Sequence, residues 1–99
     1  MEKKHTADRQ YRFHLYISGP TARSRHAVMN IKEICDQHLE QGYDLQITDI
    51  YQNPEQVAAD NIVAVPTLIK KNPLPVRRFV GDLSDTARVI SGLAIKKTA

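Results

Sequence analysis

The first half of the chain places a helix-like pattern between two strand-like ones. Over residues 11–17, apolar side chains stand at every second position, which is typical of a β-strand with one strongly apolar face. Ser18-Gly19-Pro20 ends this strand in a turn. Residues 21–41 have helical periodicity, and residues 43–50 alternate again. Because such a crossover is almost always right-handed, the pattern predicts a βαβ unit with two parallel strands.

The helix predicted over 21–41 is amphipathic and carries end signals. Thr21 or Ser24 is expected to cap its first turn. Gly42 is expected to end it, at the C′ position. The side chains predicted to face the sheet are Ala27, Val28, Ile31, Ile34, Cys35 and Leu39.

The second half carries weaker signals. Asn53-Pro54 is expected to open a short helix, because proline suits the first turn. The most apolar run, 62–69, contains Pro66, which cannot donate a backbone hydrogen bond. The strand in this run is therefore expected to begin after Pro66. A turn over 72–75 and a further strand over 76–80 follow.

A loop over 81–85 leads into the last predicted helix. Asp82 and Asp85 lie three residues apart at its start, where capping explains them better than acid–base catalysis by paired carboxylates. Gly92 weakens this helix by about 1 kcal/mol relative to alanine. One face of the helix is expected to carry Leu83, Ala87, Ile90 and Ala94.

The predicted element order is β-α-β-α-β-β-α, with a proline directly before the third strand. This is the α/β arrangement of the thioredoxin-like fold. With 99 residues the chain supports one hydrophobic core and hence one domain. We expect a flexible tail at 1–9, the domain at 10–95 and a basic tail at 96–99.

Composition and charge limit the kinds of partner that the protein is expected to bind. The net charge is +3, but lysine and arginine are scattered along the chain, and aromatic residues make up only 6%. Nucleic-acid binding is therefore not predicted. The longest uncharged run, 61–69, is far shorter than the roughly 20 residues that span a bilayer. The residues after Met1 do not form a signal peptide. We expect a cytoplasmic protein without membrane contact.

The single cysteine argues against redox chemistry. Because Cys35 is the single cysteine of the sequence, it can form neither an internal disulfide nor a CxxC pair. It falls inside the predicted helix on the apolar face, where a buried core residue is expected. Thioredoxin-like enzymes place a reactive cysteine at the start of the first helix. The corresponding segment, 18–24, contains none.

Other catalytic constellations are also unsupported. Ser18 or Ser24 with His14 or His26 as base would lack a third orienting group and an oxyanion hole. No phosphate-binding loop is present. The spacing of the four histidines matches no metal signature. We therefore predict no catalytic, cofactor-binding or metal-binding residue.

Arg77 and Arg78 are adjacent within a predicted strand. Since successive side chains point to opposite faces, both cannot lie on one solvent face. In one interpretation, one of the two arginines faces a binding partner, another subunit or an acidic group. In the other, a β-bulge changes the direction of one side chain. The sequence leaves these alternatives open.

Several motifs together resemble the KaiB family. The strongest is NPLPVRRFVGDLS at 72–84. The resemblance runs from Tyr11 to Leu93 and needs no gap. The other matching segments are Leu15 to Gly19, Asp49-Ile50 with Asn53-Pro54, Pro66 to Leu68, and Ile90 to Leu93.

The resemblance implies a small non-enzymatic protein of a circadian or clock-like system. KaiB proteins bind the N-terminal ATPase ring of the hexameric ATPase KaiC, recruit KaiA and compete with a thioredoxin-like sensor kinase domain. The family is also metamorphic: a tetrameric resting form has a rearranged second half, and a rare monomer has the thioredoxin-like fold and binds KaiC. For this chain the resemblance implies a homo-oligomer, either a dimer or a tetramer. In this chain the rearranged half would begin near Asn53.

The same resemblance implies site residues. Lys70, Arg77 and Arg78 match basic positions associated with partner binding or assembly. The residues that we associate with the fold exchange are Tyr11, Pro66, Pro73, Pro75, Gly92 and Ala94.

The chain departs from the family pattern at several positions. Ala94 stands where an acidic residue is expected, Lys97 where an aromatic residue is expected, and His26 where an arginine is common. The end of the chain, 96–99, is basic, whereas clock KaiB proteins often end in an acidic extension. An alternative is therefore an interaction module of stress or histidine-kinase signalling without a true oscillator.

Overall fold

A four-stranded mixed sheet forms the centre of the protein. The computed structural model describes residues 11–39 and 42–93. Strand β1 (Arg12–Ile17) pairs in parallel with β2 (Asp44–Asp49) and antiparallel with β3 (Thr67–Asn72). The predicted parallel βαβ unit is therefore confirmed.

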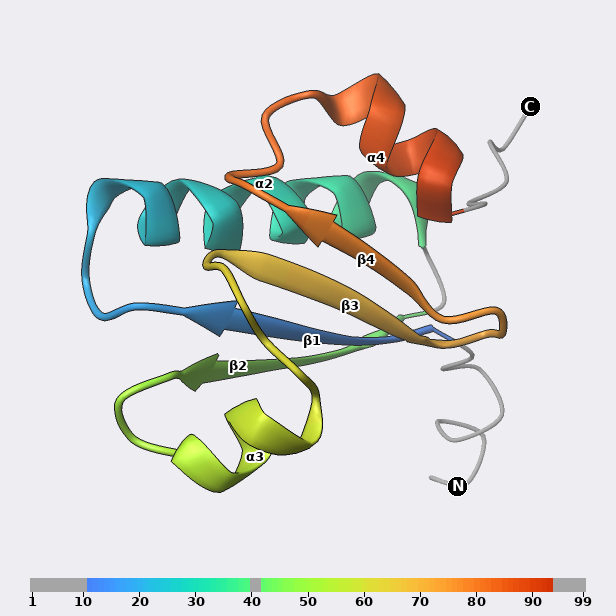
Figure 1. The fold of residues 1–99 in the computed structure, drawn as a ribbon. Coiled ribbons are helices and arrows are strands. Elements are labelled where there is room, and N and C mark those ends of the chain that lie inside the picture. The colour runs from blue at the N-terminus through green and yellow to red at the C-terminus, as the bar shows by residue number, and fades with distance from the viewer. Residues whose placement is uncertain (1–10, 40–41, 94–99) are drawn as a thin grey trace, which may run out of the picture.

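The remaining strand and the helices complete the layers. Strand β4 (Arg77–Val80) pairs antiparallel with β3, which gives the sheet order β2-β1-β3-β4. Helices α2 (Ala22–His38) and α4 (Thr86–Leu93) cover one face, and the short α3 (Pro54–Ala59) lies at the other (Figure 1). The element order is the one predicted, and the fold is thioredoxin-like.

The central strand is buried on both of its faces. Phe13 and Leu15 belong to the hydrophobic core beneath α2 and α4. His14 and Tyr16 point to the opposite face, yet they are only 3% and 0% exposed. The prediction of an apolar face is right. The second face of β1 is buried too, because α3 and the loop that follows it lie there.

Helix α2 begins as expected but ends early. Thr21 is its N-cap, and its hydroxyl oxygen accepts a hydrogen bond of 3.1 Å from the backbone N–H of Ser24. The last helical residue is His38, and Leu39 is the C-cap, with a non-helical backbone. The predicted C′ role of Gly42 is wrong. Gly42 instead closes the following turn, with a φ of 105° and its N–H bonded to the carbonyl oxygen of Leu39.

The prolines bound β3. The strand begins directly after Pro66, as predicted, and the carbonyl oxygen of Pro66 accepts a hydrogen bond from the N–H of Gly81 at 2.9 Å. The peptide bonds that precede Pro66, Pro73 and Pro75 are all cis. The last two shape the turn between β3 and β4.

The buried face of α4 differs from the prediction. The helix begins after Asp85, whose side-chain and main-chain oxygens accept hydrogen bonds from Arg88 and Val89. This start places Val89 and Leu93 in the core, while Ala87 is exposed. Leu83, in the loop before the helix, is also buried and Ile90 is half-buried. Ala94 and the predicted tails at 1–9 and 96–99 lie outside the described residues.

Asp82, the other predicted capping residue, lies ahead of the helix. Its carboxylate accepts a hydrogen bond from the N–H of Ser84 at 3.1 Å, which forms a local turn. In the part of the chain that the structure describes, no helix has the length and apolar character needed to cross a membrane.

Candidate functional site

A layer of polar side chains separates the sheet from α3. We call it the α3 layer and define it by its members, which are His14, Tyr16, Thr48, Asp60 and Lys71. They come from β1, β2, the residue after α3, and β3. Helix α3 itself has no buried residue. Ile69 of β3, which pairs with His14 on this face, is 1% exposed, so both hydrogen bonds and apolar packing hold this side of the molecule together.

Asp60 is the hub of the α3 layer. Its Oδ2 accepts a hydrogen bond of 2.5 Å from the hydroxyl of Tyr16, and its Oδ1 accepts one of 2.8 Å from Nζ of Lys71. Burial by itself would raise the pKa of Asp60. The hydrogen bonds from Lys71 and Tyr16 outweigh it and hold this pKa below its ordinary value. Burial and the bond to Asp60 raise the pKa of Tyr16.

His14 stacks on Tyr16 within the same layer. Their ring centroids are 4.2 Å apart and the planes differ by 9°. Nε2 of His14 is hydrogen-bonded to Oγ1 of Thr48 at 2.8 Å. Burial lowers the pKa of His14 below 6.5; Lys71 acts in the same direction and Asp60 opposes it. His14 is therefore neutral near pH 7.

Arg78 closes the layer from β4. Its guanidinium donates hydrogen bonds to the carbonyl oxygens of Asp60 and Asn61, at the end of α3. The register between β3 and β4 is regular, so no bulge rotates Arg77 or Arg78. The two arginines thus point to opposite faces. Backbone carbonyls, not an acidic side chain, receive Arg78.

Lys70 is placed differently from an ordinary surface lysine. It pairs with Phe13 on one side and Arg77 on the other, and it is 1% exposed. Burial, and then the neighbouring charge of Arg77, lowers the pKa of Lys70. Arg77 is exposed. The structure brings Lys70 and Arg77 together on one face of the sheet and separates them from Arg78.

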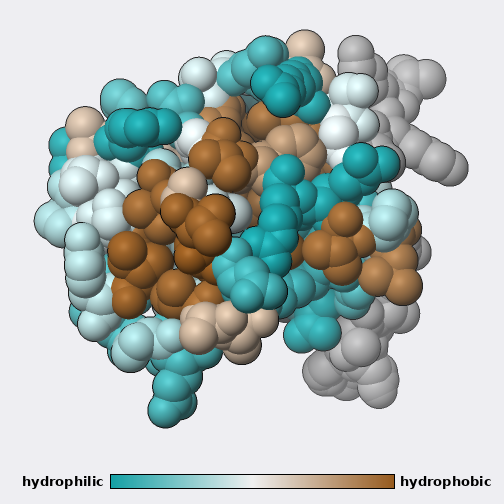
Figure 2. Space-filling view, viewed as in Figure 1, coloured by the Kyte–Doolittle hydropathy of each residue, from teal (hydrophilic) through white to brown (hydrophobic). Residues whose placement is uncertain are grey.

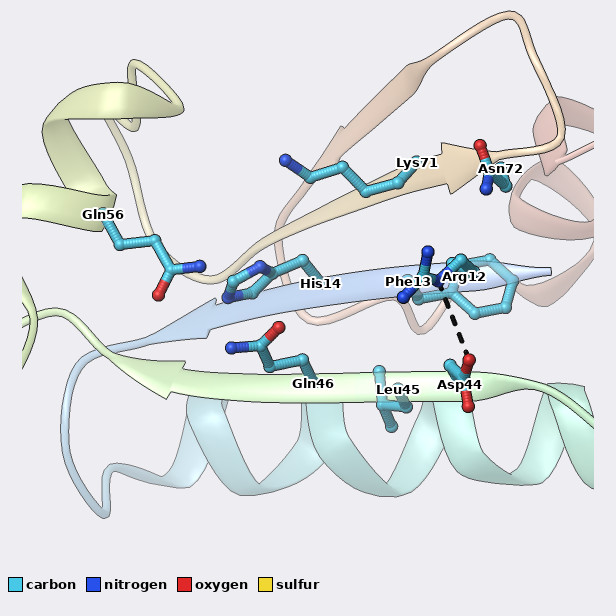
Figure 3. A pocket seen from close by; sticks show the side chains of 9 residues that line it. All are labelled: Arg12, Phe13, His14, Asp44, Leu45, Gln46, Gln56, Lys71 and Asn72. Carbon is cyan, nitrogen blue, oxygen red and sulfur yellow. Dashed lines mark ion pairs between the residues drawn. The ribbon is translucent and has the colours of Figure 1, made fainter. Parts of the chain in front are cut away.

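A groove of about 450 Å³ opens beside the α3 layer. His14 forms its floor, Gln46 and Gln56 point into it from either side, and Lys71 extends along its upper edge (Figure 3). At the far end, Nε of Arg12 lies 3.7 Å from Oδ2 of Asp44. The groove is polar, and it gives water a route towards His14.

A second groove, of about 730 Å³, lies between the start of α2, β4 and α4. Arg23, Arg78 and Arg88 line it, together with the carboxylates of Asp82 and Asp85. Hydrogen bonds from Ser84 lower the pKa of Asp82, and the charge of Arg23 adds to the effect. We call this the arginine groove.

Apolar side chains are exposed close to the arginine groove. Figure 2 shows an apolar patch over the region where β3 begins and β4 ends. Val80 at the end of β4, which lines the arginine groove, is 65% exposed, and Val63, in the segment between α3 and β3, is 95% exposed. Exposed aliphatic side chains beside arginines are typical of an interaction surface.

Ser24 and His14, one of the serine–histidine pairs considered from the sequence, each bond to other groups. The hydroxyl of Ser24 is bonded to Thr21 and to the N–H of Ser18, whereas His14 is bonded to Thr48 across the sheet. Cys35 is buried, and burial raises the pKa of its thiol to about 12. Among the described residues, no cluster of histidine, cysteine and carboxylate groups could hold a metal ion.

The fold-exchange residues lie in several environments. Tyr11 is half-buried and stacks on Phe13 with ring centroids 6.0 Å apart. Pro66 is buried, Pro73 is half-buried and Pro75 is exposed. Gly92, in α4, packs against the ring of Phe79, which comes from β4. Ala94 lies outside the described residues.

The α3 layer is the part of the site that the sequence did not predict. Alternation in β1 already places His14 and Tyr16 on one face. The parallel pairing of β1 with β2 then brings Thr48 to the same region. The hub, Asp60, lies in an irregular segment with no periodicity. Its contact with Tyr16, 44 residues earlier, leaves no local signal.

Solved structures define the class of protein. The N-terminal domain of Synechococcus elongatus SasA matches with a TM-score of 0.70 at 20% identity, covering 92% of this chain and 90% of that one. Fasciola hepatica thioredoxin matches with a TM-score of 0.68 at 18% identity, covering 96% and 90%. This is a thioredoxin-like domain without a cysteine at the start of its first helix.

Sequence comparison then assigns the family. The KaiB domain matches residues 14–95. Circadian clock protein KaiB3 of Synechocystis sp. is 41% identical over 81 residues, which are 82% of this chain and 79% of that protein. Circadian clock oscillator protein KaiB of Prochlorococcus marinus is 42% identical over 83 residues, 84% of this chain and 70% of that one. The chain belongs to the KaiB family.

Proposed function

We propose that this protein is a non-enzymatic KaiB-like regulator that binds a KaiC-type hexameric ATPase and modulates a circadian or clock-like timing system. One observation carries the proposal. The KaiB domain covers most of the chain, and the relatives at 41–42% identity are named as circadian clock proteins. We place the protein in the cytoplasm, where such an ATPase would be met.

A regulatory role without catalysis agrees with the site. The segment 18–24, where thioredoxin-like enzymes place the reactive cysteine, has no thiol. Cys35 is buried in α2. The protein would therefore act by binding alone.

The docking face that we propose combines the arginine groove with the apolar patch. Arg23 and Arg88 are exposed and supply positive charge, and Val63 and Val80 supply apolar anchors. Such a face suits an acidic partner surface with apolar pockets, because complementary charge guides association and buried aliphatic groups slow dissociation.

Lys70, Arg77 and Arg78 remain our proposed residues for partner binding or assembly. Arg77 has the side chain that is best placed for a partner, since it is exposed on the face opposite α3. Arg78 lines the arginine groove while it binds the end of α3. Any contribution of Lys70 would follow a rearrangement, because it is buried in this fold.

We also propose that the second half exchanges with a different packing, from Asn53 onwards, in a dimer or tetramer. Two packings of one sequence need differ by only a few kcal/mol. The absence of buried residues in α3 supports a weakly held start of the second half. The residues that we associate with this exchange are Tyr11, Pro66, Pro73, Pro75, Gly92 and Ala94.

The departures at His26, Ala94 and Lys97 favour the second candidate, an interaction module of stress or histidine-kinase signalling. Its partner would be a sensor domain rather than the ring, and a KaiA-like protein is a further candidate in either case. A KaiC-type ATPase encoded beside this protein would favour the first proposal.

Size-exclusion chromatography with light scattering tests the proposal. The protein would be run alone and after hours of incubation with the host's KaiC-type ATPase and ATP. We expect slow capture of one copy per ATPase subunit. A dimer or tetramer that never joins the ring would contradict the proposal and direct the search to sensor kinases.

A matched pair of variants tests the docking face. Arg23→Glu reverses a charge in the arginine groove near the start of α2. Lys32→Glu makes the same kind of change further along the helix, where the side chain is also exposed. We expect Arg23→Glu to weaken capture by about tenfold or more and Lys32→Glu to leave it within a factor of two. Equal effects of the two variants would show that the arginine groove is not the docking face.

A further inference from the structure

His14 is a buried base that the proposed function does not use. It is 3% exposed, lies beneath α3 and contributes nothing to the docking face. A neutral imidazole is easily buried, whereas an imidazolium needs hydrogen-bond acceptors and an opposite charge. We propose that His14 is a protonation switch: neutral His14 keeps α3 docked on the sheet, and protonation of His14 releases α3.

His14 and the carboxylate of Asp60 are not joined by a hydrogen bond, and each oxygen of that carboxylate already accepts one bond from another side chain. His14 already uses Nε2 for Thr48, which can donate to it or accept from it. Protonation makes both ring nitrogens donors, so Nδ1 needs an acceptor as well. Oδ1 and Oδ2 of Asp60 are bound by Lys71 and Tyr16. The side chain of Gln56 reaches towards His14, and as a neutral amide it offers no compensating charge (Figure 3).

The charges around His14 act in both directions: Asp60 favours an added cation, and Lys71, whose effect is smaller, opposes it, so the opposition to protonation comes from burial. From β1 and β2, Arg12 and Asp44 form an ion pair at the far end of the groove. From β3 and β4, Lys71 and Arg78 are both cations on the α3 side of the sheet. Lys71 within the layer and Arg78 at its edge are thus two cations beside one carboxylate, Asp60. Protonated His14 would add a third cation.

Few contacts attach α3 to the sheet. None of its residues is fully buried, although Gln56 and Val57 are half-buried. The hydroxyl of Tyr16 reaches the carbonyl oxygen of Gln56 at 3.4 Å, and the other attachments pass through Asp60 and Asn61 at its end. His14 is 3% exposed at the floor of the groove while α3 is docked, and release of α3 would expose both ring nitrogens to water.

The direction of the pH effect follows from burial. Burial lowers the pKa of His14 in the docked state, with Lys71 acting in the same direction and Asp60 opposing it. A released His14 titrates near 6.5. The released state therefore binds the proton more strongly. Docking of α3 is fully favoured above pH 6.5 and weakens as the pH falls from 6.5 towards the lowered pKa.

Hydrogen exchange of single amides tests the switch. The reporters are the N–H groups of Val57, Asp60 and Ile62, which bond within α3 and its C-terminal turn. The reference is the N–H of Leu39, bonded to Cys35 in α2. Between pH 7.5 and 5.5, we expect protection factors at the reporters to fall by about tenfold and the reference to stay constant. NMR titration should show His14 protonating over the same pH interval.

Two variants and a control make the test decisive. His14→Gln keeps a polar side chain that does not titrate, and His14→Phe fills the site with an apolar ring, so either one that folds can be used. Each should abolish the pH dependence at the reporters, whereas His26→Gln, at an exposed position, should retain it. Persistence of the effect without His14, or equal loss of protection at α2 and α3, would overturn the proposal.

Discussion

The ring of Phe79 occupies the space that a side chain at Gly92 would need. A Cβ placed on Gly92 would lie 2.5 Å from Cζ and 2.6 Å from Cε2 of that ring. Phe79 projects from β4 towards α4 and is half-buried there. The glycine that weakens α4 therefore also allows β4 and α4 to approach closely, so the two positions are coupled.

Gly92→Ala is expected to lower the free energy of unfolding by up to about 2 kcal/mol. Overpacking against Phe79 costs roughly 1–3 kcal/mol, and the better helix propensity of alanine offsets about 1 kcal/mol of it. In a Phe79→Ala background the clash is absent, so the same change should be neutral or stabilising. Urea denaturation of the four proteins gives the coupling free energy. An equal effect of Gly92→Ala in both backgrounds would contradict the contact.

Lys71→Met is expected to raise the pKa of Asp60. In the folded protein, burial acts to raise this pKa, and the hydrogen bonds from Lys71 and Tyr16 bring it below its ordinary value. Because the folded-state pKa is lowered, the carboxylate contributes stability above the unfolded pKa of about 3.9 and loses it as the pH falls through the folded value. The variant should therefore unfold in acid at a higher pH.

Carbonyl NMR titration of Asp60 and acid unfolding followed by circular dichroism provide the measurements. Lys32→Met, which removes an exposed lysine from α2, is the control and should leave both unchanged. An unshifted Asp60 in Lys71→Met would mean that Tyr16 alone holds the carboxylate. The same variant should raise the pKa of His14, because Lys71 acts to lower it.

The sequence was sufficient for most of the fold. Period-two alternation located β1 and β2, helical periodicity located α2, and Pro66 located the start of β3. These signals are local and strong. The predictions that were wrong concern helix ends, where the capping residues set the boundaries of α2 and α4. Leu39 leaves the helical conformation before Gly42 is reached, and the start of α4 at Asp85 turns Ala87 to solvent.

The α3 layer could not be predicted because its contacts are long-range and polar. Nothing in the sequence near Asp60 indicates that Tyr16 and Lys71 will share its two oxygens. The contacts of the Arg78 side chain could not be predicted for the same reason. Alternation correctly separated it from Arg77, but its acceptors are backbone carbonyls of Asp60 and Asn61, which carry no residue-specific signal.

Arg78→Ala is expected to loosen the end of α3. Its guanidinium binds two carbonyl oxygens there, and loss of an exposed charged donor costs roughly 1 kcal/mol, or about fivefold in hydrogen exchange. The amides of Asp60 and Asn61, bonded to Gln56 and Ala58, report the change. Arg77→Ala, one residue away on the opposite face, should leave these amides unaffected. If both variants speed exchange alike, the clamp by Arg78 is not what holds α3.

Cys35 is expected to react with thiol reagents only when the protein opens. Burial, assisted by the charge of Asp36, raises the pKa of its thiol from 9.0 to about 12. The thiolate fraction near pH 8 is then lower by about a thousandfold than that of a free thiol. Labelling with Ellman's reagent should be slow in buffer and immediate in denaturant. The control is the double variant Ser91→Cys, Cys35→Ser, which carries its thiol at an exposed position of α4. It should label at once both in buffer and in denaturant. Native labelling of Cys35 at the rate of this control would place a reactive thiol in a protein that we describe as acting by binding alone.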